Sequence, residues 1–280
     1  MPEPVDYTVR ARNLVPASDN KIHDDAVAQQ FGFSGALVPG VDVFAYASHP
    51  FVEAWGLEFF SGGRLHMRFR RPVYDGDDIT ASVSGPGERG AFEVNVAAAD
   101  GEPRALGTAW AKTVADVGLS HFVRTPHTGE RLPTGPAPLP LGPLGSIDEP
   151  GDAERHDAYL DGINESLPLY HLEPVVHPGA LLRLVNELLV RNVALGPWIH
   201  TASDATFLAP ARLPAALTAD GVVTAEFERN GHRYVRYDAL VRSDGVPVLV
   251  VDHTAIYRLA HPLPHPQPTG RPPSAGTVQQ

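Results

Sequence analysis

Two stretches of the chain repeat one pattern of hydrophobic and polar positions. Each opens with Pro-Gly, continues with apolar residues at helical spacing, breaks at a glycine and ends in an alternating run that closes at a proline. The two stretches are residues 39–74 and 178–211. The outer prolines are 33 residues apart in the first stretch, from Pro39 to Pro72, and 32 apart in the second, from Pro178 to Pro210. We interpret the chain as a tandem duplication.

Each copy predicts one helix followed by strands. The helices are expected to begin at Pro39-Gly40 and at Pro178-Gly179. Apolar residues at the spacing of one helix face are Val41, Phe44, Ala45 and Val52 in the first copy and Leu181, Leu184, Val185 and Leu188 in the second. Period-two runs predict strands over residues 63–74, 91–98, 105–114, 222–229, 234–241 and 248–257, with matching Asp-Gly hairpin turns at 100–101 and 244–245. This order of elements predicts an α+β fold.

The same patterns set the expected domain boundaries. Residues 1–120 are expected to form an N-terminal repeat, residues 121–160 a Pro/Gly-rich linker laid over the surface, residues 161–260 a C-terminal repeat, and residues 261–280 a disordered Pro-rich tail. A short helix is expected over residues 153–164, where the linker leads into the second copy.

Composition narrows the classes of function. The 280 residues are 43% hydrophobic, which is enough for a buried core, and no apolar run reaches the ~18–20 residues of a membrane helix. The first residues show no secretory pattern, so we expect a cytoplasmic protein without a membrane partner. The net charge of -11 argues against nucleic acid as a partner. The absence of cysteine excludes thiol chemistry, and no histidine or carboxylate spacing indicates a metal site.

One segment, SDNKIHDDAVAQQFGFSGALVPG at residues 18–40, concentrates polar and titratable residues before the first long helix. A carboxylate and an imidazole can together supply the base and the acid that addition of water to a double bond requires. A free N–H at a helix N-terminus, such as that of Gly40, can stabilise a developing oxyanion. The same residues also suit an N-cap, an acidic first helical turn and a tight turn. Arginines 64, 68, 70 and 71 gather on one expected strand, where they suit either phosphate binding or an exposed face.

The segment resembles the signature of the MaoC-like, (R)-specific enoyl-CoA hydratase family, which reads Asp-x-Asn-Pro-x-His-x-Asp, followed by Gly-Phe and then by His-Gly before the central helix. The matching residues are Asn20, Ile22, His23, Asp25, Gly32-Phe33 and Gly40. The chain departs from the signature at Ser18, which stands where the family has its catalytic Asp, at Lys21 in place of the proline and at Pro39 in place of the second His. The nearest carboxylate to the family's Asp position is Asp19.

The resemblance implies a double hotdog fold over residues 5–260, with the signature in the first copy only. It implies a hydratase or dehydratase that adds water reversibly to a trans-2-enoyl-CoA or enoyl-carrier-protein thioester, in fatty acid or polyketide metabolism. Asp19 and His23 would transfer protons, Asn20 would orient them, and the Gly40 N–H would bind the thioester oxygen. Residues assigned to substrate binding are Ser18, Arg64, Arg68 and Arg70. No metal ion or redox cofactor is implied, and a homodimer is compatible with the resemblance.

Three interpretations of the segment stay open on the sequence. Asp19 takes the place of the missing Asp, or His23 serves another reaction such as thioester hydrolysis, or the site only binds acyl chains or is structural. The corresponding alternatives are a thioesterase, a conjugate-addition tailoring enzyme and a catalytically degenerate acyl-thioester binding protein. The second copy, with His177 before its helix, is expected to be a degenerate partner that walls an acyl tunnel. His66, His200 and His253 are expected to be hydrogen-bonded core or surface residues.

Overall fold

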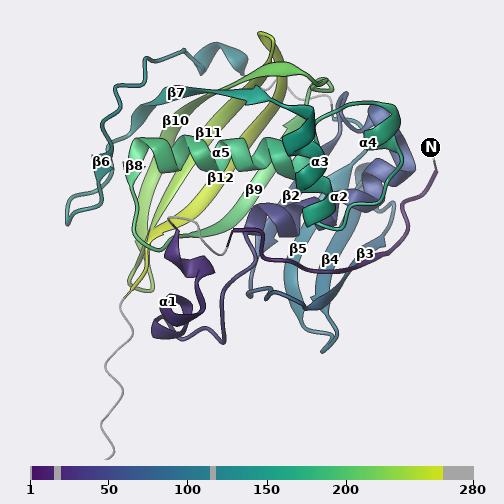
Figure 1. Ribbon diagram of the computed structural model, residues 1–280, viewed down its shortest axis with the longest axis horizontal. Coiled ribbons are helices and arrows are strands. Elements are labelled where there is room, and N and C mark those ends of the chain that lie inside the picture. Colours follow the sequence, from purple (N-terminus) through teal and green to yellow (C-terminus); the bar gives the residue numbers. More distant parts are fainter. Residues whose placement is uncertain (1, 16–19, 114–117, 261–280) are drawn as a thin grey trace, which may run out of the picture.

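The computed structural model describes residues 2–15, 20–113 and 118–260, and it consists of one large sheet with two long helices packed on one face (Figure 1). The long helices are α2 (Gly40–Trp55) and α5 (Pro178–Asn192). Shorter helices are α1 (Asp25–Gln30), α3 (Ala153–Gly162) and α4 (Leu169–Leu172). Within the described residues, no helix combines the length and the hydrophobicity needed to cross a membrane.

The sheet has ten antiparallel strands in the order β1-β3-β4-β5-β2-β9-β12-β11-β10-β7. The strands of the N-terminal half are β1 (Tyr7–Arg10), β2 (Arg64–Phe69), β3 (Asp78–Ser84), β4 (Phe92–Ala98) and β5 (Pro103–Trp110). Those of the C-terminal half are β7 (Gly142–Gly151), β9 (Ile199–Phe207), β10 (Ala215–Arg229), β11 (His232–Ser243) and β12 (Val246–Arg258). The two short strands β6 (Leu132–Pro133) and β8 (Val193–Ala194) pair separately.

The strand order confirms the predicted duplication. Read outward from the centre, the N-terminal half runs β2-β5-β4-β3-β1 and the C-terminal half runs β9-β12-β11-β10-β7, so each strand has a counterpart at the same place. The halves join where β2 pairs with β9, with Leu65 opposite Ala205 and Met67 opposite Ser203. Both predicted Asp-Gly turns connect the equivalent hairpins, β4–β5 and β11–β12. One continuous sheet therefore serves both copies.

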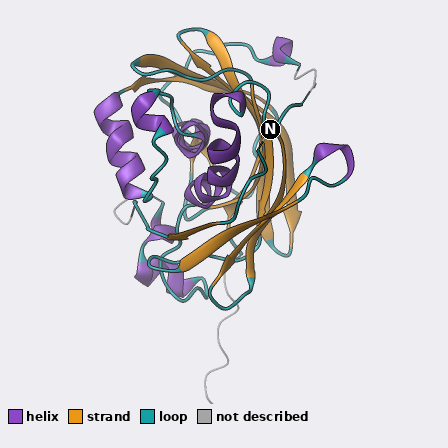
Figure 2. Ribbon diagram, turned by 90° about the vertical axis from the view of Figure 1, so that its right-hand side faces the viewer, coloured by secondary structure: helices purple, strands orange, loops and turns teal. Residues whose placement is uncertain are grey.

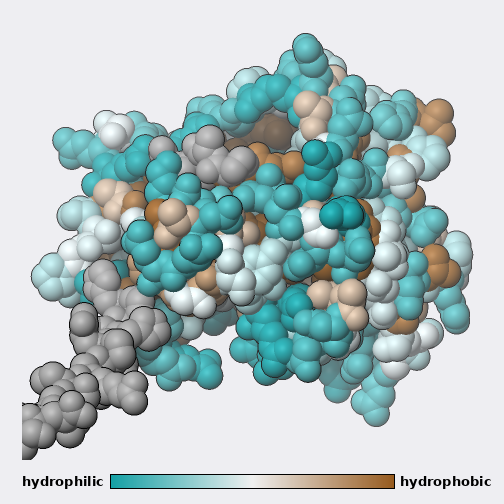
Figure 3. Space-filling model, turned by 60° about the horizontal axis from the view of Figure 1, so that its bottom comes forward, coloured by the Kyte–Doolittle hydropathy of each residue, from teal (hydrophilic) through white to brown (hydrophobic). Residues whose placement is uncertain are grey.

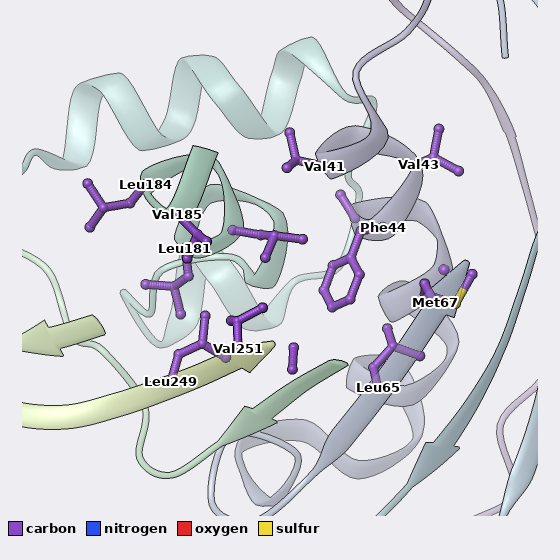
Figure 4. Close-up of a cluster of buried hydrophobic side chains, with 14 of the residues drawn as sticks. Val41, Val43, Phe44, Leu65, Met67, Leu181, Leu184, Val185, Leu249 and Val251 are labelled. Carbon is purple, nitrogen blue, oxygen red and sulfur yellow. The ribbon is translucent and has the colours of Figure 1, made fainter. Parts of the chain in front are cut away.

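The core lies between the sheet and the two long helices. Figure 2 shows the sheet curving around the helices. Figure 4 shows Phe44 of α2 and Leu181 of α5 directed toward sheet residues that include Leu65 and Val251. All four of these side chains are fully buried, and burial of a large apolar side chain stabilises the fold by about 1.5–3 kcal/mol. The helices α2 and α5 also pack on each other, so neither half has a separate core.

The region between the copies differs from the linker expected over residues 121–160. It contains β7, a strand that pairs with β10 and buries Leu144 and Ile147 against the core. Its two prolines, Pro143 and Pro150, are compatible with a strand because β7 is the last strand at one edge of the sheet formed by the described residues. The helix expected over residues 153–164 is present as α3. The tail expected to be disordered, residues 261–280, lies outside the described residues.

The surface carries few large hydrophobic side chains. The face seen in Figure 3 is mostly hydrophilic, and hydrophobic residues reach it in small patches, one of them inside a hollow. Among the described residues, the exposed large hydrophobic side chains are Val5, Leu119, Val123, Leu132, Leu141, Leu172, Phe227 and Val246. Most of these are scattered singly, as is normal on a protein surface. Phe227 differs, because it stacks on Tyr234 and both rings line the cavity described next.

Candidate active site

A cavity of about 1150 Å³ lies where the ends of β2 and β9 meet the N-terminus of α2. Segments far apart in the sequence line it, among them residues 20–23, residues 37–43, the end of β2 with the residues that follow, the start of β9, the turn that joins β10 to β11, and β12. The cavity is large enough for a ligand of drug size. Both halves of the chain supply its walls, as expected if the second copy walls the site of the first.

His23 contributes a buried imidazole to this cavity. Its Nδ1 lies 2.6 Å from the Leu37 carbonyl oxygen, and because a carbonyl only accepts, Nδ1 carries the proton. Burial lowers the pKa of His23 to about 4, against the opposing effect of that hydrogen bond. The ring is therefore neutral at pH 7, with Nε2 unprotonated. An unprotonated imidazole nitrogen on a cavity wall is suited to act as a general base.

Asn20 holds the His23 loop to the opposite half of the protein. Its Nδ2 donates to the Trp198 carbonyl oxygen at 3.0 Å, and its Oδ1 accepts from the Trp198 N–H at 3.1 Å, which defines the orientation of the amide. The same Nδ2 lies 3.2 Å from His23 Nε2, so the amide donates to the basic nitrogen. Asn20 thus contacts His23 as the predicted orienting residue would. It also ties the signature segment to the residues just before β9.

Gly40 begins α2, and its N–H is one of the first N–H groups that have no acceptor inside the helix. The preceding residue, Pro39, makes no side-chain cap. In the other half, His177 caps α5 by accepting the Gly179 N–H at 3.0 Å. Tyr159 fills the space beside Gly179, since an added carbon there would meet its hydroxyl at 2.4 Å. Of the two equivalent helix N-termini, the uncapped one at α2 lines the cavity.

The C-terminal half contributes His200 and Ser203, both lining the cavity from β9. A regular strand would place residues three apart on opposite faces. Here β9 has one more residue than β12 at Thr201, a β-bulge, and both side chains end up buried on the same face. His253 on β12 stands opposite Ser203 and is also buried.

These three side chains form a short chain of hydrogen bonds. Ser203 Oγ lies 2.7 Å from His200 Nε2 and 2.9 Å from His253 Nδ1, and the two imidazoles stack with centroids 4.1 Å apart. Burial lowers the pKa of His200 to about 3 and that of His253 well below its usual value, so both rings are neutral. The expectation that His200 and His253 are hydrogen-bonded core residues is confirmed. What the sequence did not indicate is that His200 also reaches the cavity, because the bulge that turns it inward has no sequence signal.

The predicted arginines divide into two groups. Arg68 and Arg70 are exposed at the cavity, and Arg229 joins them from the end of β10; no ion pair is formed by any of the three within the described part of the chain. Arg64 is not among the lining residues. It binds Asp204 through two hydrogen bonds of 2.7 and 2.5 Å and lies over the ring of Trp110. Arg64 is the first residue of β2, at the end away from the cavity, so it pairs with Asp204 across the join of the two halves and does not reach the cavity.

Ser18 and Asp19 lie outside the described residues, so the geometry of the predicted Asp19–His23 pair stays a prediction. His66 lines the cavity, as does Asn186 of α5, whose Oδ1 is buried without a hydrogen-bond partner. Neither Asn186 nor Ser203 was among the predicted site residues. Over residues 2–15, 20–113 and 118–260, no cluster of histidine and acidic side chains is arranged to hold a metal ion.

Comparison with known proteins shows the fold. No protein-family model matches the chain, and no curated protein matches it in sequence. A solved structure described as a putative MaoC domain protein dehydratase from Chloroflexus aurantiacus J-10-fl covers 91% of this chain and 96% of its own length, with a TM-score of 0.61 and 14% identity. A conserved hypothetical protein from Mycobacterium tuberculosis, described as having a double hotdog fold, covers the same shares with a TM-score of 0.58 and 13% identity.

A third structure, described as a MaoC-like dehydratase, covers 91% of this chain and 98% of its own, with a TM-score of 0.56 and 13% identity. The likeness extends over both halves and the shared sheet. The chain is therefore a double hotdog, and the predicted α+β fold is confirmed. The structures that it resembles include MaoC-type dehydratases, the group whose signature the segment at residues 18–40 resembles.

Proposed function

We propose that the chain is an acyl-thioester hydratase or dehydratase, which adds water reversibly to a trans-2-enoyl-CoA or enoyl-carrier-protein thioester. The observation that carries the proposal is that His23 and the uncapped N-terminus at Gly40 line one cavity. A base for water and a donor for the thioester oxygen are the two groups that this reaction needs from the protein. The fold of the MaoC-type dehydratases supports the same reaction class.

In the hydration direction, His23 Nε2 takes a proton from water while the water oxygen forms a bond to C3 of the enoyl group. The electron pair of the C2–C3 double bond moves to C2 and delocalises onto the thioester oxygen, where the Gly40 N–H donates to it. A proton then bonds to C2 and gives the 3-hydroxyacyl thioester. The Asp19–His23 pair delivers to C2 the proton that His23 took from water, so both side chains end in the protonation state in which they began, and dehydration follows the same steps in reverse. The Asn20 amide positions the His23 ring and gives up its hydrogen bond to Nε2 when water arrives.

The arginines at the cavity support a substrate with phosphates on its carrier. Arg68, Arg70 and Arg229 are cations without a carboxylate partner in the described residues of a protein with a net charge of -11. Coenzyme A and the phosphopantetheine arm of a carrier protein both carry phosphate, which guanidinium groups bind well. The stacked rings of Phe227 and Tyr234 lie at the same cavity and offer a flat apolar surface beside these charges.

Thioester hydrolysis is the second candidate, and one observation favours it. Ser203 lines the cavity with its hydroxyl between two imidazoles, which is the kind of contact that activates a serine nucleophile. However, the Ser203 side chain is almost fully buried and both hydrogen-bonding directions of its hydroxyl are taken. We therefore place hydrolysis second.

The experiment incubates the purified protein with crotonyl-CoA and longer trans-2-enoyl-CoA thioesters, and separately with the saturated thioesters of equal length. The proposal expects loss of the conjugated double bond with formation of 3-hydroxyacyl-CoA and no release of thiol. Thiol release from the saturated thioesters, with the double bond of enoyl-CoA unchanged, would identify a thioesterase instead. Binding of both ligands without turnover would identify an acyl-thioester binding protein.

The part assigned to Asp19 is tested by substitution. Asp19→Asn removes the carboxylate and should reduce kcat for hydration strongly, whereas Ser18→Ala, at a residue assigned to substrate binding, should raise KM without a comparable loss of kcat. Ser18→Asp restores a carboxylate at the family position. A large gain in hydration from Ser18→Asp, with no loss from Asp19→Asn, would contradict the role proposed for Asp19.

A further inference from the structure

His200 lines the cavity, and one of its ring nitrogens is buried without a hydrogen-bond partner. The side chain is only 5% exposed, yet its Nδ1 has no hydrogen-bond partner. That nitrogen lies against the α-carbon of Gly40, because a carbon added to Gly40 would come within 2.8 Å of it. A buried polar atom without a partner is unfavourable unless a ligand or water completes it. Because His200 lines the cavity, a water molecule or a ligand atom that enters beside Gly40 would complete Nδ1.

The hydrogen-bond chain decides whether Nδ1 donates or accepts. The Ser203 hydroxyl donates to one imidazole and accepts from the other. If it donates to His200 Nε2, then His200 carries its proton on Nδ1 at the cavity, and His253 keeps an unprotonated Nε2 in the core. Either arrangement leaves one N–H without an acceptor in the protein: Nδ1–H of His200, which lines the cavity, in the first, and Nε2–H of His253, in the core, in the opposite one. Only the first of these lies where water or a ligand can accept it, so the first arrangement is favoured.

We propose that His200 is a further catalytic residue, whose Nδ1–H donates a hydrogen bond to the thioester carbonyl oxygen alongside the Gly40 N–H. Two donors at one oxygen stabilise the negative charge that develops there more than one does. No proton changes place in this step, so His200 stays neutral throughout. The C-terminal half thus supplies a chemical group to the site as well as a wall. This inference rests on the proposed function for its substrate class.

Ser203 and His253 act through His200 as positioning residues. The Ser203 hydroxyl fixes the ring by its hydrogen bond to Nε2, and His253 fixes the hydroxyl in turn. Phe69 contacts the His200 ring with centroids 4.5 Å apart. A neutral imidazole can hold one tautomer only if its second nitrogen has a defined partner. These contacts keep the donating nitrogen directed at the cavity.

The test compares two ligands that differ only at the carbonyl group. Butyryl-CoA carries the thioester oxygen, and S-butyl-CoA has a methylene group in its place. Calorimetric titration of the full chain should show that the wild type prefers the thioester. In His200→Leu this preference should fall by about fivefold, the equivalent of one of the two hydrogen bonds, while the affinity for S-butyl-CoA stays unchanged. In His200→Asn, which keeps an N–H near the position of Nδ1, part of the preference should return.

The kinetic expectation is a loss of about 10²–10³-fold in kcat for His200→Leu, the effect of removing one oxyanion donor, with a small change in KM. If His200→Leu does not bind S-butyl-CoA like the wild type, its site is disturbed, and Ser203→Ala replaces it as the test variant. Ser203→Ala leaves His200 in place without its partner and should lower the thioester preference. The inference is overturned if neither variant changes that preference.

Failure of this inference about His200 and failure of the proposed hydration give different experimental results. If the thioester preference depends on His200 but no enoyl-CoA is hydrated, the donor is confirmed and the proposed hydration is wrong. If hydration is found and depends on His23, but the preference is the same in His200→Leu and Ser203→Ala, the proposed function stands and the role of His200 is wrong. Loss of thiol release in Ser203→Ala would instead identify Ser203 as a nucleophile and would also overturn the inference.

Discussion

The imidazole of His200, from the C-terminal half, occupies the space that any side chain on Gly40, from the N-terminal half, would fill. A β-carbon at Gly40 would lie 2.8 Å from His200 Nδ1 and 3.1 Å from His200 Cβ and Cγ. Ser203 and Phe69 hold the ring on its other sides, so it has little room to move. Because Gly40 has no side chain, His200 can pack against it across the two halves, and a ligand can approach the N–H at the start of α2.

Gly40→Ala is therefore expected to damage the site although alanine suits a helix. The added carbon should displace His200 and cost about 1–3 kcal/mol of unfolding free energy, the usual cost of overpacking, with a strong loss of activity. Gly135→Ala, where an added carbon meets nothing within 4 Å, is the matched control. Urea unfolding of the single variants and of Gly40→Ala/His200→Ala measures the coupling. Equal destabilisation by Gly40→Ala with and without His200 would show that the two residues do not collide.

Arg68 and Arg70 are expected to bind the phosphate-bearing part of the substrate. Replacing both with alanine should raise KM for enoyl-CoA roughly fivefold to tenfold with little change in kcat, because each exposed charge contact is worth up to about 1 kcal/mol. A short enoyl thioester of N-acetylcysteamine, which has no phosphate, should be hydrated equally by both proteins. Arg131→Ala removes an exposed arginine away from the cavity and serves as the control. A similar rise in KM for both substrates would contradict the assignment.

Buried neutral histidines should make the fold sensitive to acid. His156 accepts the His177 N–H at 2.9 Å, and burial, followed by the nearby His177, lowers its pKa to about 4. An unfolded histidine titrates near pH 6.5, so between pH 6.5 and about 4 the unfolded chain binds a proton that the folded chain does not. The contribution of His156 to the free energy of unfolding should therefore be constant above pH 6.5 and should decrease as the pH falls from 6.5 to about 4. The lowered pKa values of His23 and His200 act in the same direction.

Urea unfolding at several pH values between 7 and 4.5 measures this effect. His156→Gln keeps an oxygen that can accept the His177 N–H but does not titrate. The dependence of unfolding free energy on pH should therefore decrease by about one proton in His156→Gln. Gln29→Ala, at an exposed residue that does not titrate, should leave it unchanged. Identical pH dependence in wild type and His156→Gln would show that His156 binds its proton equally in the folded and the unfolded chain.

A buried ion pair joins the two central helices. Arg183 of α5 donates to both carboxylate oxygens of Asp42 on α2, at 3.1 and 2.6 Å, and Asp42 is fully buried. Asp42→Ala leaves the guanidinium without its partner and should destabilise the protein by about 3–5 kcal/mol. Asp148→Ala breaks an exposed pair with Arg124 and should cost at most about 1 kcal/mol. Equal effects of the two variants on thermal unfolding would contradict the importance of the buried pair.

The sequence predicts the fold well because both copies carry the same helix-then-strands pattern. The helix starts at Gly40 and Pro178 and the equivalent hairpins are where the pattern expects them. The main error concerns β7, which has too many Gly and Pro residues and too little alternation to indicate a strand. Its partner β10 supplies the hydrogen bonds that define it, and that pairing is a tertiary contact that local sequence does not encode.

The candidate site was predictable only where it is local in sequence. Asn20, His23 and Gly40 belong to one segment, and the structure brings all three to one cavity. Arg64 was assigned with its neighbours on the strand, but its pairing with Asp204 depends on how β2 meets β9. The contribution of His200 depends on a bulge and on the joining of the halves. Such features arise from the register between strands, which a single sequence does not show.

The most direct test of the account compares hydration of crotonyl-CoA by the wild type and by His23→Asn. Asparagine can keep the hydrogen bond to the Leu37 carbonyl through its amide, but it has no counterpart of the basic Nε2. The account predicts that the wild type hydrates the substrate and that His23→Asn loses at least about 10²-fold in kcat/KM while unfolding at a similar temperature. His171→Asn should match the wild type. Hydration by His23→Asn at the wild-type rate would contradict the account.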